Sequence, residues 1–568
     1  MSRARLLGGV AGAATLIAAL TIVSRILGFG RWFTQAGVLG ASAVGNAYAS
    51  ANTIPNVLYE VVAGGALAGA VIPLLAGPLA KRLTGDVQAI ASALLTWALA
   101  GLVPVGIALA VFARPIAELM PMSKGSDPAA DLAQVELATT FLIVFSPQVV
   151  LYGIGVVLTG LLQAHKRFLA PVLAPIASTA VVVTSYLVFG ALADGLQDEP
   201  GRLSDASLAW LAWGTTAGVA AMSLPLLVPV FRLGIRFRPT LRFPPGVARR
   251  ARSLAFAGIG SLIAQQASVL AVVWLARGYG LVGTINVFQY SQAVYFLPYA
   301  VLAVPFATAV FPRIAELAEL SGRTDRTARS TAIDGGGSGP DEGDHDRDFA
   351  AAIASSTRTV VVAALIGVAA LIAVAPAVQS VFELMDPMPG MSAGLAWMAP
   401  GLVGYSLIFH ISRVLYSADR NRLAVGATAL GWAAVVAGCI VFVRLIAGDR
   451  GDQEGTLIAL GLGHSVGMSV AAAALLWALT RIGDGVRLAG ILRTLVTGLA
   501  AAAAAAVAGR WIVDALLAAL GTSVAPALLS GLLGGTVCII VVVGVVFLTD
   551  RELLNVIRRP RGSARPQQ

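Results

Sequence analysis

Two arginines inside an apolar stretch near the start of the chain have the clearest chemical meaning in the sequence. Arg25 and Arg31 lie in the segment from Ser24 to Pro73, in which most other residues are apolar. A charged side chain at the centre of a membrane-spanning helix costs about 2.5–3.5 kcal/mol on insertion scales, so such residues face a polar interior rather than lipid. Guanidinium groups bind phosphate oxygens through paired hydrogen bonds. The stretch therefore predicts a binding site for an anionic substrate.

The same stretch contains residues that interrupt helices. Gly28 and Gly30 lie between the two arginines, and Pro55, Gly64 and Gly65 fall in the next apolar span. Membrane helices that break at glycine or proline tend to do so around a cavity or binding site. We therefore expect helix breaks or hinges at these positions, and we expect the two spans to form one wall of a substrate cavity.

The composition predicts the class of protein independently of these residues. Of the 568 residues, 57% are hydrophobic and 12% are charged, whereas about 25% of the residues in soluble domains are charged. The chain is therefore predicted to be an all-α polytopic membrane protein. Cys439 and Cys538 both fall in apolar spans and are expected to be buried core thiols.

No residue pattern indicates an enzyme, a metal site or a cofactor. The sequence has no GxxxxGK[ST] pattern, so hydrolysis of ATP by this chain is not expected. His165, His345, His410 and His464 are scattered without zinc-ligand spacing. For His410 and His464 we expect a structural role, with a proton relay as the alternative.

Fourteen apolar spans of about 20 residues or more can be marked along the chain. They cover residues 8–34, 45–79, 88–113, 133–163, 169–194, 207–231, 253–276, 284–312, 357–382, 392–416, 424–447, 456–480, 490–516 and 525–549. The opening MSRARLLGG resembles a signal peptide, but no small-residue cleavage site follows, so a retained helix is expected.

The basic residues predict the orientation of these spans. Most of the 39 lysines and arginines fall at the two ends of the chain and in alternate loops, and few, Arg277 among them, fall in the other loops. This imbalance places both termini in the cytoplasm. A small group lies within spans or near their ends: Arg25, Arg31, Arg358, Arg413, Arg493 and Arg510. Reaching toward the interface explains Arg358, Arg493 and Arg510, whereas Arg25 lies too deep in its span.

The sequence also predicts a domain organisation. IPNVL followed by AVIP in the second span resembles LPYAV followed by AVFP in the eighth, where Pro298 marks a further helix break. This repeat favours two parallel halves of six helices each, related by an axis along the membrane normal, with two additional C-terminal helices. The predicted parts are residues 1–234, residues 235–484 with a disordered cytoplasmic loop at 321–348, residues 485–550, and a basic cytoplasmic tail at 551–568.

A polar face is expected in the eighth span. Asn286, Gln289 and Gln292 follow an i, i+3, i+6 spacing and therefore lie on one side of a helix. This face is interpreted as the opposite wall of the cavity. The alternative is ordinary hydrogen bonding between neighbouring membrane helices.

Several motifs resemble one known family. They are SRILGFGR at 24–31, GNAYASANTIPN at 45–56, GGALAGAVIP at 64–73, LPYAVLAVPFATAVFPRIAELA at 297–318 and SRVLYSADRNR at 412–422. The chain resembles the MviN/MurJ family of lipid II flippases, within the superfamily of multidrug and polysaccharide-lipid exporters, and the second span looks like the actinobacterial branch.

The resemblance implies both a fold and a cargo. The fold would be two six-helix lobes with a central cavity, and two C-terminal helices forming a groove for a lipid tail. The cargo would be lipid II, a disaccharide-pentapeptide on undecaprenyl pyrophosphate, moved from the inner to the outer leaflet of the plasma membrane for peptidoglycan synthesis. Membrane lipids and cell-wall synthesis proteins are the expected partners, and nucleic acid is not.

The resemblance carries over to the residues only in part. Arg25 and Arg31 match cavity arginines of the family, and Ser24, Asn46 and Asn56 are expected to bond phosphate or sugar oxygens. Glu60 is either a cavity carboxylate or an interfacial one. The chain departs from better-known members at four positions, Asn46, Tyr59, Gly64 and Ala293, where those members have an acidic residue, an arginine, a glutamate and an arginine.

Three functions follow as hypotheses. The first is a lipid II flippase working by alternating access, with its energy drawn from the membrane potential or an ion gradient. The second is an exporter of another undecaprenyl-linked glycan or of a small cationic drug, although a drug antiporter would be expected to show cavity carboxylates. The third is a cell-wall scaffold that transports nothing.

Overall fold

The computed structural model describes residues 3–61, 68–123, 128–245, 247–248, 251, 259–320, 340–448, 451–482 and 488–549. Within these residues the regular structure is helical, and no strand occurs. The predicted all-α fold class is therefore confirmed.

The chain divides into two compact units. The first unit contains residues 1–290 together with 385–388 and 449–453, and the remaining residues form the second unit. The division runs through α12 (Thr284–Pro298), whereas the sequence analysis placed the lobe boundary at residue 234. The difference arises because α11 (Ile259–Tyr279) packs on α2 (Ala43–Val61) and so belongs to the first unit.

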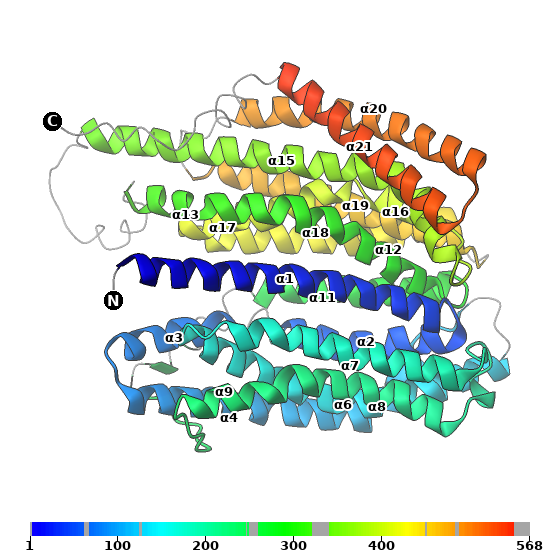
Figure 1. Ribbon diagram of the computed structural model, residues 1–568, viewed down its shortest axis with the longest axis horizontal. Helices are drawn as coiled ribbons and strands as arrows, with labels where there is room; N and C mark the ends of the chain where they lie inside the picture. The colour runs from blue at the N-terminus through cyan, green and yellow to red at the C-terminus, as the bar shows by residue number, and fades with distance from the viewer. Residues whose placement is uncertain are drawn as a thin grey trace. The chain divides into compact units, whose positions relative to one another are not determined.

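The first unit is a bundle of long helices (Figure 1). In chain order its elements are α1 (Arg3–Leu39), α2, α3 (Ala68–Ala80), α4 (Thr84–Val111), α5 (Ala113–Leu119), α6 (Pro128–Ala164), α7 (Leu169–Ala193), the 3-10 turn η2 (Pro200–Arg202), α8 (Asp205–Ser223), the 3-10 turn η3 (Leu224–Leu226), α9 (Leu227–Arg232), α11 and the first part of α12. α6 packs against α2, α4 and α8, while α7 packs against α1 and α8.

An aromatic core holds this bundle together. The ring of Tyr48 on α2 meets Phe141 and Phe145 of α6 edge-on, each with centroids 5.7 Å apart, and Tyr186 of α7 at 5.9 Å. Edge-to-face pairs of this kind contribute about 0.5–1.5 kcal/mol each beyond the area that they bury. Tyr48 therefore fixes α2 against two neighbouring helices.

The turn between α1 and α2 is fixed by residues distant in sequence. Gly40 adopts a φ of +57°, a conformation that glycine reaches without steric cost. The Ala41 N–H donates to the Asp386 carboxylate at 2.5 Å, and the Ala43 N–H donates to Asp198 at 3.1 Å. Burial raises the pKa of the Asp386 carboxyl, while the bond from Ala41 opposes that rise. The two carboxylates satisfy N–H groups that the start of α2 would otherwise leave unpaired.

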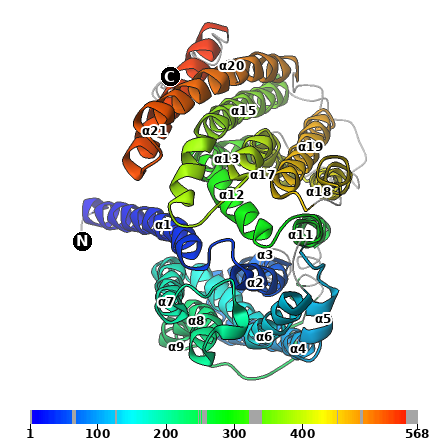
Figure 2. The same cartoon turned by 90° about the vertical axis from the view of Figure 1, so that its right-hand side faces the viewer.

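The second unit continues from α12. Its elements are the π-helical turn η4 (Tyr299–Ala303), α13 (Val304–Leu320), α15 (Pro340–Glu383), α16 (Met391–Met398), α17 (Gly401–Ser417), α18 (Asn421–Phe442), the π-helical turn η5 (Val443–Ala447), α19 (Gln453–Leu479), α20 (Leu488–Leu520) and α21 (Val524–Thr549). The two C-terminal helices, α20 and α21, pack on each other and on α15 (Figure 2).

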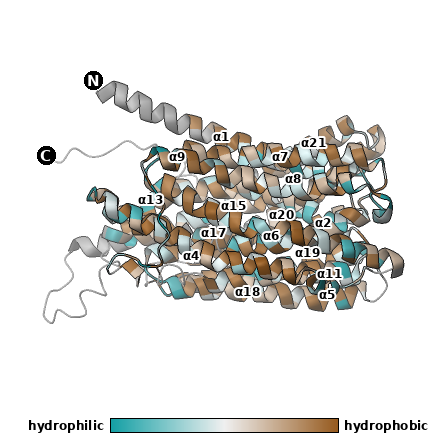
Figure 3. Cartoon of the chain, turned by 90° about the horizontal axis from the view of Figure 1, so that it is seen from below, coloured by the Kyte–Doolittle hydropathy of each residue, from teal (hydrophilic) through white to brown (hydrophobic). Residues whose placement is uncertain are grey.

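The helices are long and apolar enough to cross a membrane. Eleven of the described helical segments meet this condition, or twelve if the bent pair α16 and α17 forms one span. Apolar residues colour much of the helix surfaces in Figure 3. These segments coincide with twelve of the fourteen predicted spans, and the other two are α1 and the α2–α3 pair, so the full count stays a prediction. α2 is unusually polar for a span because it carries Asn46, Ser50, Asn52, Thr53, Asn56 and Glu60.

Three predicted helix breaks are absent. α1 runs through Gly28 and Gly30, and α2 runs through Pro55, without interruption. A single glycine costs a helix only about 1 kcal/mol, and in lipid an unbroken helix is the conformation that satisfies the backbone. Gly64 and Gly65 lie outside the described residues. At Pro298 the α-helical pattern does change, because η4 follows directly.

The predicted disordered loop at 321–348 also needs correction. α15 begins at Pro340, so residues 340–348 are helical, and residues 321–339 lie outside the described part of the chain, as does the tail at 551–568. Proline is favoured at the first position of a helix, which agrees with a start at Pro340.

Small residues allow α18 and α19 to approach closely. A Cβ atom added at Gly463 would lie 2.7 Å from the Cys439 Cα and 2.6 Å from its Sγ, and one added at Gly467 would lie 2.6 Å from the Val435 Cα. Glycines at such positions let two membrane helices come into close van der Waals contact.

We expect Gly463→Ala to lower the melting temperature of the purified protein. Alanine gains about 1 kcal/mol of helix propensity over glycine, but overpacking against the α18 backbone costs about 1–3 kcal/mol, so the loss dominates. Gly544→Ala on α21 is the matched control, because no atom lies within 4 Å of its added methyl. Thermal unfolding in detergent measures both variants, and equal melting temperatures would contradict the close α18–α19 contact.

Candidate functional site

The two arginines of α1 differ in their surroundings. Arg25 is exposed, and Arg31 is half-buried with its guanidinium 5.6 Å from the Trp32 ring centre. Because α1 is unbroken, a spacing of six residues places them about 120° apart around the helix axis. They therefore do not form one two-pronged site on a single helix face. Arg31 lies within electrostatic range of the Tyr48 and Tyr152 hydroxyls in the interior of the first unit.

Asn46 is engaged with the protein itself. Its side chain is 1% exposed, and its Nδ2 donates to the Gln134 Oε1 of α6 at 2.8 Å and to the Ser123 Oγ at 3.5 Å. Its amide group is therefore directed into the bundle. The predicted contact of Asn46 with a substrate has no support in this arrangement.

Asn56, Tyr59 and Glu60 follow one another within about one turn of α2. The Tyr152 hydroxyl of α6 donates to the Asn56 Oδ1 at 3.0 Å, and Asn56 is half-buried. Tyr59 packs its ring on Tyr152 with centroids 4.3 Å apart. Glu60 is exposed, and Ser24 of α1 is half-buried.

Arg277 belongs to the interior of the first unit. The sequence analysis placed it in a loop, but it lies in the last turn of α11 and is only 5% exposed. Its Nη1 donates to the Ser50 Oγ of α2 at 3.1 Å, and its Nε donates to the Pro121 carbonyl at 3.0 Å. Asp131 of α6 is the carboxylate that acts electrostatically on it. Arg277 thus ties α11 to α2.

The polar residues of α12 are divided between the two units. Asn286 is buried, and a Cβ added at Gly45 of α2 would lie 3.0 Å from its Nδ2. Gln289 donates from its Nε2 to the Thr53 Oγ1 of α2 at 3.4 Å. Gln289 therefore forms a hydrogen bond between two helices, which is the alternative to a cavity wall named in the sequence analysis. Gln292 and Ala293, both half-buried, belong to the second unit.

The buried histidines bond to neighbouring helices of the second unit. The Nε2 atoms of His410 and His464 lie 3.2 Å from the hydroxyls of Ser356 and Tyr295. Within the described residues, no group of three or more His, Cys, Asp and Glu side chains could hold a metal ion. These contacts account for both histidines as links between helices.

Sequence reasoning missed several residues of this interior. Tyr48, Gln134, Tyr152 and Arg277 bond or pack across helices, but their residue types alone do not show which neighbouring helix they meet. A useful signal was available for Tyr152, because the spacing of Tyr152, Thr159 and Gln163 puts three polar residues on one face of α6.

The fold defines a class of membrane protein. A solved structure of a multidrug resistance MATE family transporter of the MOP superfamily, in an inward-facing conformation, shares this fold at a TM-score of 0.58 and 15% identity, covering 81% of this chain and 94% of that one. A solved structure of lipid II flippase MurJ, in an inward closed conformation, is more similar, with a TM-score of 0.68 and 18% identity over 95% of this chain and all of that chain. The protein is thus a multi-pass membrane protein with the fold of these transporters.

The family follows from the sequence comparison. The family model for lipid II flippase MurJ matches residues 35–530, and the chain belongs to this family. A probable lipid II flippase MurJ of Rhizobium tropici is 26% identical over 52% of this chain, and a lipid II flippase MurJ of Burkholderia cenocepacia is 27% identical over 53%. The matches span 53% and 56% of those relatives, so the chain matches about half the length of each.

We expect Arg277→Met to destabilise the first unit by about 2–3 kcal/mol, because it removes two buried hydrogen bonds from a charged group and leaves the Ser50 hydroxyl and the Pro121 carbonyl without this donor. Arg114→Met is the matched control, since Arg114 is exposed and pairs with Glu118 at 2.8 Å, and surface pairs contribute at most about 1 kcal/mol. Thermal unfolding in detergent compares them. Equal, small effects would show that Arg277 does not anchor α11.

Proposed function

We propose that the protein translocates lipid II from the inner to the outer leaflet of the plasma membrane by alternating access. Membership of the lipid II flippase family supports this proposal most directly. The names of the two relatives and of the most similar solved structure described above point to the same cargo.

Arg31 is the observation from the chain itself that carries the proposal. A half-buried guanidinium in an apolar span offers five N–H donors to a pyrophosphate in a region of low dielectric constant. Arg25 is exposed on another face of α1 and suits an encounter role, drawing the anionic head group toward α1. A cationic drug would find an unfavourable charge here, so the drug-export alternative is disfavoured.

An apolar pocket in the second unit suits the lipid tail. It encloses about 510 Å³ and is lined by residues of α17, α19 and α20, including Val403, Leu476, Trp477, Leu492, Leu495 and Leu499. Side chains of this kind bury hydrocarbon at about 25 cal/mol per Å². The predicted tail groove of the C-terminal helices is consistent with this surface of α20.

The remaining parts of the proposal rest on the sequence. The distribution of basic residues places both termini in the cytoplasm. Transport is driven by the membrane potential or an ion gradient, since about 2.3 kcal/mol is available per charge per 100 mV. Cell-wall synthesis proteins are the proposed partners. The competing function is a scaffold that transports nothing, and the complementation experiment below distinguishes it from a flippase.

Complementation tests the function in cells. After depletion of the resident lipid II flippase of an actinobacterial host, we expect this chain to restore growth and outer-leaflet lipid II. Arg31→Ala should reduce the outward flux about tenfold to a hundredfold, because a hydrogen bond to a charged group contributes about 1.5–3 kcal/mol. Arg25→Ala should have a smaller effect, and Arg31→Lys should restore part of the activity.

The matched control is Arg114→Ala, which removes an exposed arginine of the same unit. Equal abundance of all variants in the membrane must be established by immunoblot. Rescue by Arg31→Ala at wild-type levels would favour a scaffold, which should tolerate the change. Failure of well-expressed wild-type protein would favour another glycan-lipid cargo.

A further inference from the structure

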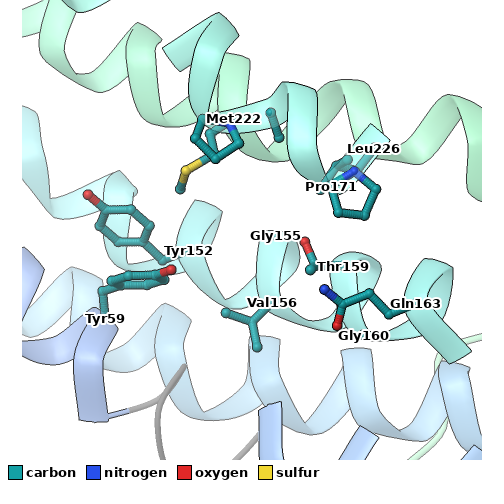
Figure 4. A pocket seen from close by; sticks show the side chains of 12 residues that line it. Tyr59, Tyr152, Gly155, Val156, Thr159, Gly160, Gln163, Pro171, Met222 and Leu226 are labelled. Atoms are coloured by element: carbon teal, nitrogen blue, oxygen red, sulfur yellow. The ribbon is translucent and has the colours of Figure 1, made fainter. Parts of the chain in front are cut away.

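A pocket inside the first unit is separate from Arg25 and Arg31. It encloses about 320 Å³ between α2, α6, α7 and the α8–η3 segment (Figure 4). Binding sites for small molecules range from about 300 to 1,000 Å³. The pocket is therefore large enough for one ring-sized group and too small for a whole glycopeptide head group.

One face of α6 supplies the floor of this pocket. Tyr152, Thr159 and Gln163 are spaced i, i+7 and i+11, which places them in line along the helix. Gly155 and Gly160 also line the pocket, and they let neighbouring helices pack closely on α6, since an added Cβ would lie 2.6 Å from the Ser223 Oγ and 2.7 Å from the Val71 Cγ1. Tyr152, Thr159 and Gln163 thus make this wall of the pocket polar.

Two of the polar side chains on this floor, Thr159 and Gln163, are available for a ligand. Thr139 and Thr140, on the same helix, donate their hydroxyls to the Val135 and Glu136 carbonyls at 2.7 and 3.0 Å. The Thr159 hydroxyl makes no such bond, and among the described residues neither it nor the Gln163 side-chain amide has a hydrogen-bond partner. Figure 4 shows both side chains at the open space of the pocket.

The two tyrosines form a fixed aromatic end. Tyr59 and Tyr152 pack with centroids 4.3 Å apart and ring planes 35° from parallel. The hydrogen bond from Tyr152 to Asn56 holds the inner ring in place. Aromatic rings that are already oriented bind a flat apolar surface at little entropic cost.

The opposite wall is formed by α7. Pro171 and Pro175 both line the pocket. Because Pro175 has no N–H, the Pro171 carbonyl lacks its usual helical donor four residues later. This carbonyl therefore keeps an unused hydrogen-bond acceptor position on α7.

The lining selects a neutral ligand. None of the lining residues carries a full charge, so neither a pyrophosphate nor the carboxylates of a peptide would find a counter-charge there. A pyranose ring with an N-acetyl group matches the pocket: its C–H face packs on an aromatic ring, and its hydroxyl and amide groups bond to Thr, Gln and carbonyl groups. We propose that this pocket binds one N-acetylhexosamine ring of the glycolipid head group.

The proposal rests on the proposed function and adds a sugar subsite to it. Tyr152 lines this pocket and lies within electrostatic range of Arg31, and both residues belong to the first unit. A glycolipid would therefore be recognised by its charge at Arg31 and by its first sugars at Thr159 and Gln163.

Binding to the purified full-length protein in nanodiscs tests this subsite. Two probes are compared, lipid II and undecaprenyl pyrophosphate, which share the chain and the pyrophosphate and differ in the sugar-peptide. The double variant Thr159→Val/Gln163→Leu should bind lipid II about tenfold more weakly and undecaprenyl pyrophosphate equally well. Thr140→Val is the matched control, since it removes a hydroxyl of α6 outside the pocket, and Arg31→Ala should weaken both probes.

The outcomes separate the two proposals. Unchanged lipid II affinity in the double variant, or equal loss for both probes, would overturn the sugar subsite while the flippase proposal stands. Equal affinity of the wild-type protein for the two probes would also overturn it. If the wild-type protein binds neither probe although its melting temperature shows that it is folded, the proposed function itself fails, and the subsite fails with it.

Discussion

A network of buried polar side chains fixes α1 and α2 in the first unit. The Tyr48 hydroxyl lies 2.9 Å from that of Tyr186 and 3.0 Å from the Thr215 Oγ1, and Tyr186 donates to Gln35 at 3.3 Å. These four residues come from α2, α7, α8 and α1. Unpaired polar groups are costly in an interior without water, so rotation of α1 or α2 would break several bonds together. The position of Arg31 and the orientation of the α2 polar face depend on this constraint.

The two units are stabilised by different means. In the first, buried polar contacts such as Arg277 with Ser50 join the helices. In the second, glycines such as Gly463 bring α18 and α19 into close contact. Membrane helices lack a hydrophobic driving force toward one another, so both devices are needed in place of it. The first unit can therefore present polar groups to a substrate, and the second can present apolar surfaces to a lipid chain.

The sequence predicted the membrane class and the places of the spans, because apolar runs of about 20 residues are a strong local signal. It also singled out Arg31, since a charge in such a run is rare. It erred at Gly28, Gly30 and Pro55, where a continuous helix satisfies the backbone better than a break. Residue type alone could not show that Asn46 points toward Gln134, because the direction of a side chain is set by the packing of distant helices. The pocket beside Tyr152 required the same tertiary information.

The most direct test is lipid II movement by the purified protein in proteoliposomes. Fluorescent lipid II is placed in both leaflets, and access to a membrane-impermeant quencher is followed over time under an imposed membrane potential. We expect wild-type protein to move lipid II faster than protein-free vesicles, and Arg31→Ala protein to lose most of this increase. Movement at the protein-free rate by folded, inserted wild-type protein, whatever the direction of the potential, would contradict the assignment of the chain as a lipid II flippase.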